Sequence, residues 1–215
     1  MLILASGSPR RKEILTMLGY SFLVDPADVD ESLPGGIAPH DAVAELSRRK
    51  ALETAARRPD DVVLGSDTVV SVAGEILGKP RDREDAVRML RLLSGKTHQV
   101  YTGVTLAGRG DVQTVVAEAD VTFLPMTEAQ IQTYLATGEP FDKAGAYAVQ
   151  GRGSAYIRSI SGDFFAIMGL PSSQTVQMCI RDRLYKDAGV PDGVVNIVTC
   201  SRNEIDTILD RKSVV

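Results

Sequence analysis

Three cations stand in the first turn of a helix predicted near the N-terminus. Arg10, Arg11 and Lys12 follow Ser6-Gly7-Ser8-Pro9, which ends a short apolar strand predicted over residues 2–5. A helix N-terminus favours Asp or Glu, so three cations there oppose the helix dipole. A bound polyanion would relieve the conflict, because helix N–H groups, hydroxyls and guanidinium groups could all bind its oxygens. The alternative is a solvated helix start, and the local sequence does not decide between the two.

A carboxylate lies between two valine-rich segments that are predicted to be strands. Asp67 belongs to Gly65-Ser66-Asp67-Thr68, which separates residues 62–64 from residues 69–72. An unpaired buried charge is costly, so this carboxylate must be hydrogen bonded, bound to a metal or exposed at a cleft. Its candidate roles are general base and metal ligand. The alternative is an Asx turn that joins two strands.

Two lysines and a glutamate are weaker candidates for the same chemistry. Lys50 shares a helical stripe with Val43 and Leu46, so it should face the body of the protein, although lysine stems often only cover apolar surface. Lys79 stands in a Gly-Lys-Pro sequence after a predicted strand and could reach a phosphate, but such a sequence is also an ordinary turn. Glu31, in an acidic loop, could offer an oxygen ligand to Mg²⁺ or could simply be solvated.

Helices and strands in mixed order must position these residues. The predicted helices cover about residues 9–18, 41–58, 82–95 and 127–138, and the predicted strands cover residues 2–5, 62–64, 69–72, 75–77, 100–106 and 112–123. Further short strands are expected near Tyr147, Ile157 and Phe165. Because strict βαβ alternation is missing, we expect an α/β fold with a mixed central sheet and flanking helices, and not a barrel or a doubly wound parallel sheet.

Composition and missing motifs exclude several classes of protein. The 215 residues carry a net charge of -4 and no basic tract, which argues against binding to duplex nucleic acid. The apolar stretches are far shorter than a membrane helix and no signal-peptide core is visible, so a cytoplasmic location is expected. Two cysteines and two histidines cannot form a Cys/His zinc cluster, and His98 is interpreted as structural. Neither a P-loop nor a dinucleotide-binding glycine motif is present.

Five motifs follow one another along the chain. They are Ala5-Ser6-Gly7-Ser8-Pro9-Arg10-Arg11, Gly65-Ser66-Asp67-Thr68, Gly78-Lys79-Pro80, Leu93-Ser94-Gly95-Lys96-Thr97-His98-Gln99-Val100 and Asp142-Lys143-Ala144-Gly145-Ala146-Tyr147-Ala148-Val149-Gln150-Gly151. Together they closely resemble the Maf family of nucleoside triphosphate pyrophosphatases. The resemblance implies two lobes around a cleft, as in Maf and ITPase-like folds, in a cytoplasmic and often dimeric enzyme. Such an enzyme hydrolyses the bond between the α- and β-phosphates and releases a nucleoside monophosphate and pyrophosphate.

The resemblance also implies roles for individual residues. Asp67 would be the catalytic base or a metal ligand, and Glu31 a second ligand to Mg²⁺ or Mn²⁺. The residues expected to bind the nucleoside triphosphate are Ser8, Arg10, Arg11, Lys50, Thr68, Lys79 and Gln150. Of these, Arg10, Thr68 and Gln150 match the subgroup that prefers dTTP and UTP, whereas the subgroup acting on 7-methyl-GTP differs around these positions.

Two other functions stay open at this stage. The protein could be a non-catalytic nucleotide-binding regulator of cell division or septum formation, which would bind nucleotides without metal-dependent pyrophosphate release. It could also hydrolyse modified pyrimidine nucleotides as a cleaning step, a function that differs only in substrate. The intact Arg10, Asp67 and Lys79 favour an enzyme.

The C-terminal part departs from the family pattern. The resemblance ends at Gly169-Leu170-Pro171, so we predict a Maf-like domain over 1–171 and an atypical tail over 172–215. Residues 188–199 look like a short piece of an aldehyde dehydrogenase, and residues 179–183 and 210–215 look like translated sequencing-adapter read-through. We therefore expect a foreign or misassembled tail without activity, and full activity in a chain that ends near residue 178. The alternative is a natural divergent C-terminus packed on the main domain.

Overall fold

The computed structural model describes residues 1–108 and 110–187, with side chains up to residue 179. Within it, Met1–Met178 form one compact unit. The interpretations of residues 188–199 and 210–215 lie outside the described residues. The buried side chains of Thr175 and Met178 belong to the compact unit, and the domain boundary at residue 171 stays a prediction.

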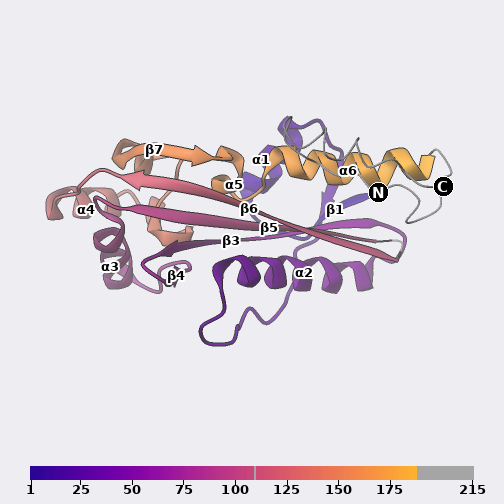
Figure 1. Cartoon of the computed structure of the whole chain (residues 1–215), viewed down its shortest axis with the longest axis horizontal. Coiled ribbons are helices and arrows are strands. Elements are labelled where there is room, and N and C mark those ends of the chain that lie inside the picture. Colours follow the sequence, from indigo (N-terminus) through magenta and orange to yellow (C-terminus); the bar gives the residue numbers. More distant parts are fainter. Residues whose placement is uncertain (109, 188–215) are drawn as a thin grey trace, which may run out of the picture. The chain divides into compact units, whose positions relative to one another are not determined.

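A seven-stranded mixed sheet forms the centre of this unit (Figure 1). The strands are β1 (Leu2–Leu4), β2 (Phe22–Val24), β3 (Val62–Val72), β4 (Glu75–Leu77), β5 (Thr97–Gly108), β6 (Asp111–Phe123) and β7 (Ile157–Gly162). Their order is β2-β1-β3-β5-β6-β7, and β4 also pairs with β3. The two pairs that include β1 are parallel, and all other pairs are antiparallel. The predicted α/β fold with a mixed sheet and flanking helices is confirmed.

Helices cover both faces of the sheet, with α2 on one face and α1 and α5 on the other (Figure 1). The α-helices are α1 (Pro9–Met17), α2 (Pro39–Arg57), α3 (Arg83–Leu93), α4 (Glu128–Leu135), α5 (Phe164–Met168) and α6 (Ser172–Asp187), and the 3-10 helices are η1 (Glu139–Asp142), η2 (Ala144–Ala146) and η3 (Arg152–Tyr156). The predicted capping box of Thr127 and Gln130 is present at α4. Ser8 precedes α1 as expected, but its side chain makes no capping hydrogen bond.

Three local predictions were wrong. Residues 62–64 and 69–72 belong to one continuous strand, so Gly65-Ser66-Asp67-Thr68 is not an Asx turn. Pairing with β5 along residues 63–71 supplies the ladder hydrogen bonds that override the local turn propensity. Tyr147 follows η2, where Gly145 and Ala146 have positive φ angles, and is therefore not in a strand. Phe165 lies in α5, because Asp163 accepts its N–H and caps a helix. Ile157 does begin a strand, as predicted.

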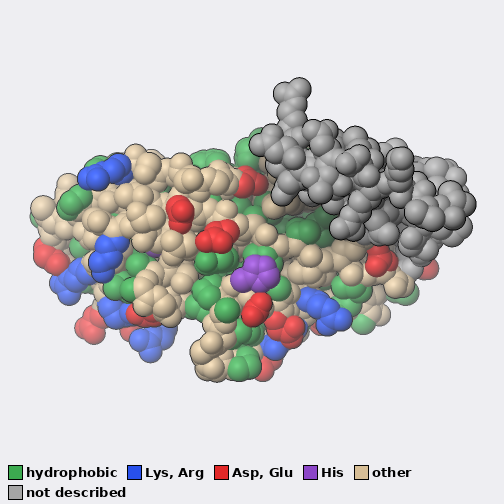
Figure 2. Space-filling view, in the orientation of Figure 1, with side chains coloured by type: hydrophobic (Ala, Val, Ile, Leu, Met, Phe, Trp, Pro, Cys, Tyr) green, Lys and Arg blue, Asp and Glu red, His purple; other side chains and the backbone are tan. Residues whose placement is uncertain are grey.

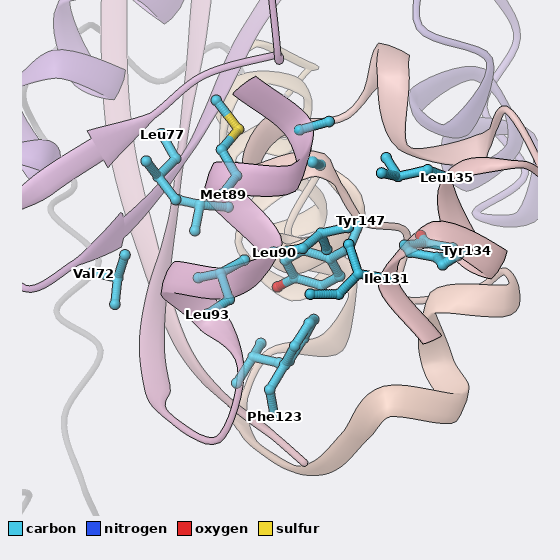
Figure 3. Packing of buried hydrophobic residues seen from close by; sticks show 14 of the residues in the cluster. Val72, Leu77, Met89, Leu90, Leu93, Phe123, Ile131, Tyr134, Leu135 and Tyr147 are labelled. Carbon is cyan, nitrogen blue, oxygen red and sulfur yellow. The ribbon is translucent and has the colours of Figure 1, made fainter. Parts of the chain in front are cut away.

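Two apolar clusters pack against opposite ends of β3. One contains Val63 with Ile3 and Ala5. The other contains Val70 and joins α3, α4 and the neighbouring strand ends, with Leu90, Leu93, Ile131, Phe123 and Tyr147 turned toward one another (Figure 3). Because burial of apolar area is the main stabilising term of folding, both ends of β3 are anchored. Asp67 therefore lies between two anchored ends of the strand.

His98 is buried in the larger cluster. Its Nε2 lies 2.8 Å from the Tyr147 hydroxyl, and its ring packs edge-to-face on Phe123. Its Nδ1 has no hydrogen-bond partner among the described residues. Burial lowers the pKa of His98 from 6.5 to about 4, so the ring is neutral in the folded protein at neutral pH. This environment agrees with the structural role interpreted for His98.

The free energy of unfolding should therefore depend on pH through His98. Between pH 6.5 and pH 4 the unfolded chain binds a proton that the folded chain does not, so acid favours unfolding. Across this range the free energy of unfolding should fall by about 3 kcal/mol. We expect His98→Gln to flatten the slope of the melting temperature against pH in this window. The exposed His40→Gln is the control, and an unchanged slope in His98→Gln would contradict the assignment.

Candidate active site

The predicted carboxylate lies on an open edge of β3. On this edge, β1 pairs with Val62–Leu64 and β4 pairs with residues 70–72, while β5 occupies the opposite edge. Among the described residues, no strand pairs with residues 65–69 on the open edge. Within this interval Asp67 and Thr68 are partly exposed and could meet a ligand, whereas Gly65, Ser66 and Val69 are buried like both ends of the strand.

Two predicted motifs converge on this open interval because of the direction of the strands that precede them. The parallel strand β1 runs toward the interval from one end and continues into Ser6-Gly7-Ser8-Pro9. The antiparallel strand β4 approaches from the other end and continues into Gly78-Lys79-Pro80. Sheet register thus directs the start of α1, with Arg10 and Arg11, and the loop of Lys79 toward the open interval.

A lysine of helix α2 forms an ion pair with Asp67. Lys50 Nζ lies 2.6 Å from Asp67 Oδ1 and 2.7 Å from Glu31 Oε1. The side chains of Lys50 and Asp67 are 12% and 13% exposed, whereas that of Glu31 is 61% exposed. One ammonium group therefore bridges two carboxylates, of which one is nearly buried and the other faces solvent. The predicted orientation of Lys50 toward the body of the protein is confirmed.

The helix can come this close because two sheet positions lack side chains. A Cβ on Gly65 would lie 2.4 Å from the Ser47 carbonyl oxygen, and one on Gly103 would lie 2.2 Å from the Val43 carbonyl oxygen. Gly103 is the register partner of Asp67 on β5. Glycine at these positions thus allows the backbone of α2 to lie directly on the sheet, which places Lys50 within hydrogen-bonding distance of Asp67.

Arg11 reaches the opposite face of β3 and is held by neutral acceptors. Its Nε donates to the Gly169 carbonyl at 2.9 Å, and its two terminal nitrogens donate to Ser6 Oγ at 2.9 Å and Thr68 Oγ1 at 3.3 Å. Burial lowers the pKa of Arg11, and the nearby Asp67 carboxylate acts in the opposite direction. No acidic side chain among the described residues forms an ion pair with Arg11. Its positive charge is thus available to an anion.

The remaining sequence-predicted residues form no hydrogen bond or ion pair with Lys50 or Asp67 in the described part of the chain. Ser8 donates its N–H to Ser6 Oγ at 3.2 Å, so it belongs to the loop that meets Arg11. Burial lowers the pKa of Arg10, while Asp142 most strongly opposes this. Lys79 is exposed, and its loop is joined to the 142–151 motif because the Gly145 N–H donates to the Gly78 carbonyl at 3.0 Å. Gln150, in the same motif, is exposed.

Sequence reasoning missed two residues that hold Arg11 and Thr68, which are Gly169 and Thr102. The Gly169 carbonyl also accepts a hydrogen bond from Ser66 Oγ at 2.9 Å. Thr102 lies 2.9 Å from Thr68 between hydroxyl oxygens and donates to the Ala166 carbonyl at 2.7 Å. The Gly-Leu-Pro sequence at residues 169–171 was a signal for this segment, but it did not indicate a contact with Arg11, 158 residues away.

The donor set fits a divalent metal that is shared with a substrate. No group of three or more His, Cys, Asp or Glu side chains within the described part of the chain could hold a metal ion. Asp67 and Glu31 nevertheless offer two hard carboxylate donors, which both contact the Lys50 ammonium group, at 2.6 and 2.7 Å. Mg²⁺ commonly binds through one or two carboxylates and completes its coordination with water and substrate phosphates. These residues fit such an ion only if a phosphate supplies further ligands.

The face drawn in Figure 2 shows no dominant charge. Acidic and basic side chains are interspersed over the part of the face that Figure 2 colours. This agrees with the absence of a basic tract in the sequence. Among the helices that the structure describes, none is long and apolar enough to cross a membrane.

Comparisons with known proteins agree with the motifs. The family model described as "Maf-like protein" matches residues 1–181. The "dTTP/UTP pyrophosphatase" of Symbiobacterium thermophilum is 52% identical over 178 residues, which are 82% of this chain and 91% of that protein. The protein of the same name from Bacillus pumilus is 44% identical over 177 residues, which are 82% of this chain and 94% of that protein. The solved Staphylococcus aureus Ham1 structure shares 10% identity at a TM-score of 0.44, over 84% of this chain and 98% of that one. The chain belongs to the Maf family.

Proposed function

We propose that this protein hydrolyses dTTP and UTP to the nucleoside monophosphate and pyrophosphate. The observation that carries the proposal is the bridge from Lys50 to Asp67 and Glu31. Arg11, which forms no ion pair among the described residues, interacts electrostatically with Asp67 from the opposite face of β3. The relatives described above, at 52% and 44% identity, are named for this activity. The protein would thus be a hydrolase of nucleotide metabolism that acts on an acid anhydride.

The cations would bind the triphosphate and stabilise its transition state. A nucleoside triphosphate carries about four negative charges, and positioned cations stabilise charge that develops on the phosphate oxygens. Arg11 is held by neutral acceptors, so it keeps its full charge for the substrate. Arg10, in the first turn of α1, and Lys79, in the loop after β4, would add charge, and Ser8 a hydroxyl. Lys50 would release one carboxylate and donate to a phosphate oxygen.

Asp67 would orient the attacking water or accept its proton. Hydrolysis adds water across the bond between the α- and β-phosphates, so one product gains a hydroxyl and pyrophosphate leaves. An ordinary aspartate is a weak base, so orientation of water could contribute more than proton abstraction. When bound by Asp67 and Glu31, Mg²⁺ or Mn²⁺ would neutralise phosphate charge and lower the pKa of water.

The substrate preference would depend on residues outside the Lys50–Asp67 pair. Arg10, Thr68 and Gln150 are the positions that match the dTTP- and UTP-preferring subgroup. Thr68 is held by Thr102 and Arg11, so its hydroxyl has a defined position on β3. Hydrolysis of modified pyrimidine nucleotides would use the same centre. A homodimer and a cytoplasmic location, both expected from the resemblance, remain predictions.

The test is pyrophosphate release from a panel of dTTP, UTP, CTP, ATP, GTP and 7-methyl-GTP, with Mg²⁺, with Mn²⁺ and with chelator. We expect metal-dependent release that is selective for dTTP and UTP. Binding of dTTP by the folded protein without release would favour the nucleotide-binding regulator. Preferential release from 7-methyl-GTP would overturn the proposed subgroup.

Lys79→Ala should mainly weaken binding of the triphosphate. Loss of one charged hydrogen bond to a phosphate should raise the KM for dTTP about tenfold with a small change in kcat. Lys96→Ala is the matched control, because Lys96 is also exposed but far from Asp67. It stands before β5, about 20 Å along that strand from Gly103, the register partner of Asp67. Steady-state kinetics of both variants make the comparison. Wild-type kinetics in Lys79→Ala would remove this lysine from the site.

A further inference from the structure

Arg49, next to Lys50 on α2, holds the loop that carries Glu31. One terminal nitrogen, Nη1, donates to the carbonyl of Asp30 at 3.0 Å and to the carbonyl of Ser32 at 2.9 Å. Its Nε donates to Glu45 Oε1 at 2.7 Å, one helical turn earlier. Arg49 is therefore held on its helix by Glu45 and binds the backbone on both sides of Glu31.

The position of Glu31 depends on these Arg49 hydrogen bonds, because few other contacts hold its loop. The structure assigns no helix or strand to residues 25–34, and the Glu31 side chain is 61% exposed. A local turn orders the adjoining backbone, since the Ser32 N–H and hydroxyl both donate to the Asp30 carboxylate, at 2.8 and 2.6 Å. These hydrogen bonds lower the pKa of Asp30, with a smaller effect of Arg49 in the same direction. The turn shapes the loop, but Arg49 joins it to α2.

Two consecutive helix residues thus act on one glutamate. Arg49 binds its flanking carbonyls, and Lys50 binds its carboxylate at 2.7 Å. We propose that Arg49 is a positioning residue that acts through Glu31 and keeps this carboxylate beside Asp67 for the shared metal ion. This inference rests on the proposed function. Lysine cannot replace Arg49, because one ammonium group lacks the planar fork that reaches Glu45 and both carbonyls together.

The direct test measures Mn²⁺ binding and not turnover. The wild type, Arg49→Ala, Glu31→Gln and the double variant are titrated with Mn²⁺ in the presence of α,β-imido-dUTP, and free Mn²⁺ is measured by electron paramagnetic resonance. Loss of a residue that orients a metal ligand should weaken Mn²⁺ binding about tenfold or more in each single variant. In the Glu31→Gln background, Arg49→Ala should change the affinity by less than about twofold, because both changes remove the same ligand.

Arg48→Ala and Arg49→Lys complete the design. Arg48 is exposed on the same helix turn, so its removal controls for lost charge and should leave Mn²⁺ binding at the wild-type level. Arg49→Lys keeps the charge and should still weaken binding. In turnover assays, Arg49→Ala should raise the apparent KM for Mn²⁺ more than it lowers kcat at saturating metal.

Additive losses from Arg49→Ala and Glu31→Gln would overturn the inference, since Arg49 would then act independently of Glu31. Wild-type Mn²⁺ affinity in Arg49→Ala, or in Glu31→Gln, would overturn it as well. The proposed function would fail by a different result: the wild-type protein would release no pyrophosphate from dTTP or UTP. The coupling between the two variants can be measured in either case, because the binding assay needs no hydrolysis.

Discussion

Asp67→Asn should lower kcat for pyrophosphate release from dTTP by about 10³-fold or more while the fold persists. The substitution removes the charge that would orient water or bind metal, but it keeps the size of the side chain and an oxygen that can accept a hydrogen bond from Lys50. Lys50 also keeps its ion pair with Glu31 at 2.7 Å, so the variant does not bury an uncompensated ammonium. The melting temperature should therefore stay close to that of the wild type.

Two controls separate chemistry from folding in this variant. Asp111→Asn changes an exposed carboxylate at the β5–β6 hairpin, where the amide oxygen can still accept the Val112 N–H, and it should keep wild-type activity. Binding of α,β-imido-dUTP to Asp67→Asn, measured by calorimetry, should remain detectable, because the cations are intact. Wild-type release of pyrophosphate by Asp67→Asn would refute the role assigned to this carboxylate.

Gly65→Ala should destabilise the protein by about 3 kcal/mol through overpacking. Its Cβ would lie 2.4 Å from the Ser47 carbonyl oxygen and 2.6 Å from the Ala51 nitrogen, and both belong to the backbone of α2. A helix backbone cannot yield as a flexible side chain can, so α2 must move away from the sheet. That movement would also separate Lys50 from Asp67, and a displacement of about 1 Å at a reacting centre can lower the rate about 10²-fold.

Gly35→Ala is the matched control for Gly65→Ala. A Cβ on Gly35 would meet no atom within 4 Å, and its backbone needs no positive φ angle. Its free energy of unfolding should stay within about 1 kcal/mol of the wild type, since alanine there only reduces the freedom of the unfolded chain. Urea unfolding and pyrophosphate release are measured for both variants. Equal stability of the two variants would show that α2 does not lie as close to β3 as described.

Much of the fold could be predicted because its signals are local. The Thr127 and Gln130 capping box and the end of α1 before Gly19 involve hydrogen bonds or φ angles within a few residues. The continuity of β3 through Asp67 could not be predicted in this way. It depends on pairing with Gly103 and its neighbours on β5, and an isolated Gly-Ser-Asp-Thr sequence favours a turn.

The residue types of the candidate site, and the family that their motifs resemble, could be recognised from the chain alone. The partners of these residues followed from packing in three dimensions. Lys50 meets Asp67 because α2 packs onto Gly65, and Arg11 meets the Gly169 carbonyl because α5 returns to the sheet. Arg49 carried no motif signal, since its acceptors are backbone carbonyls. The physical reason is that such contacts join residues far apart in the chain, and their geometry follows from packing rather than from local propensity.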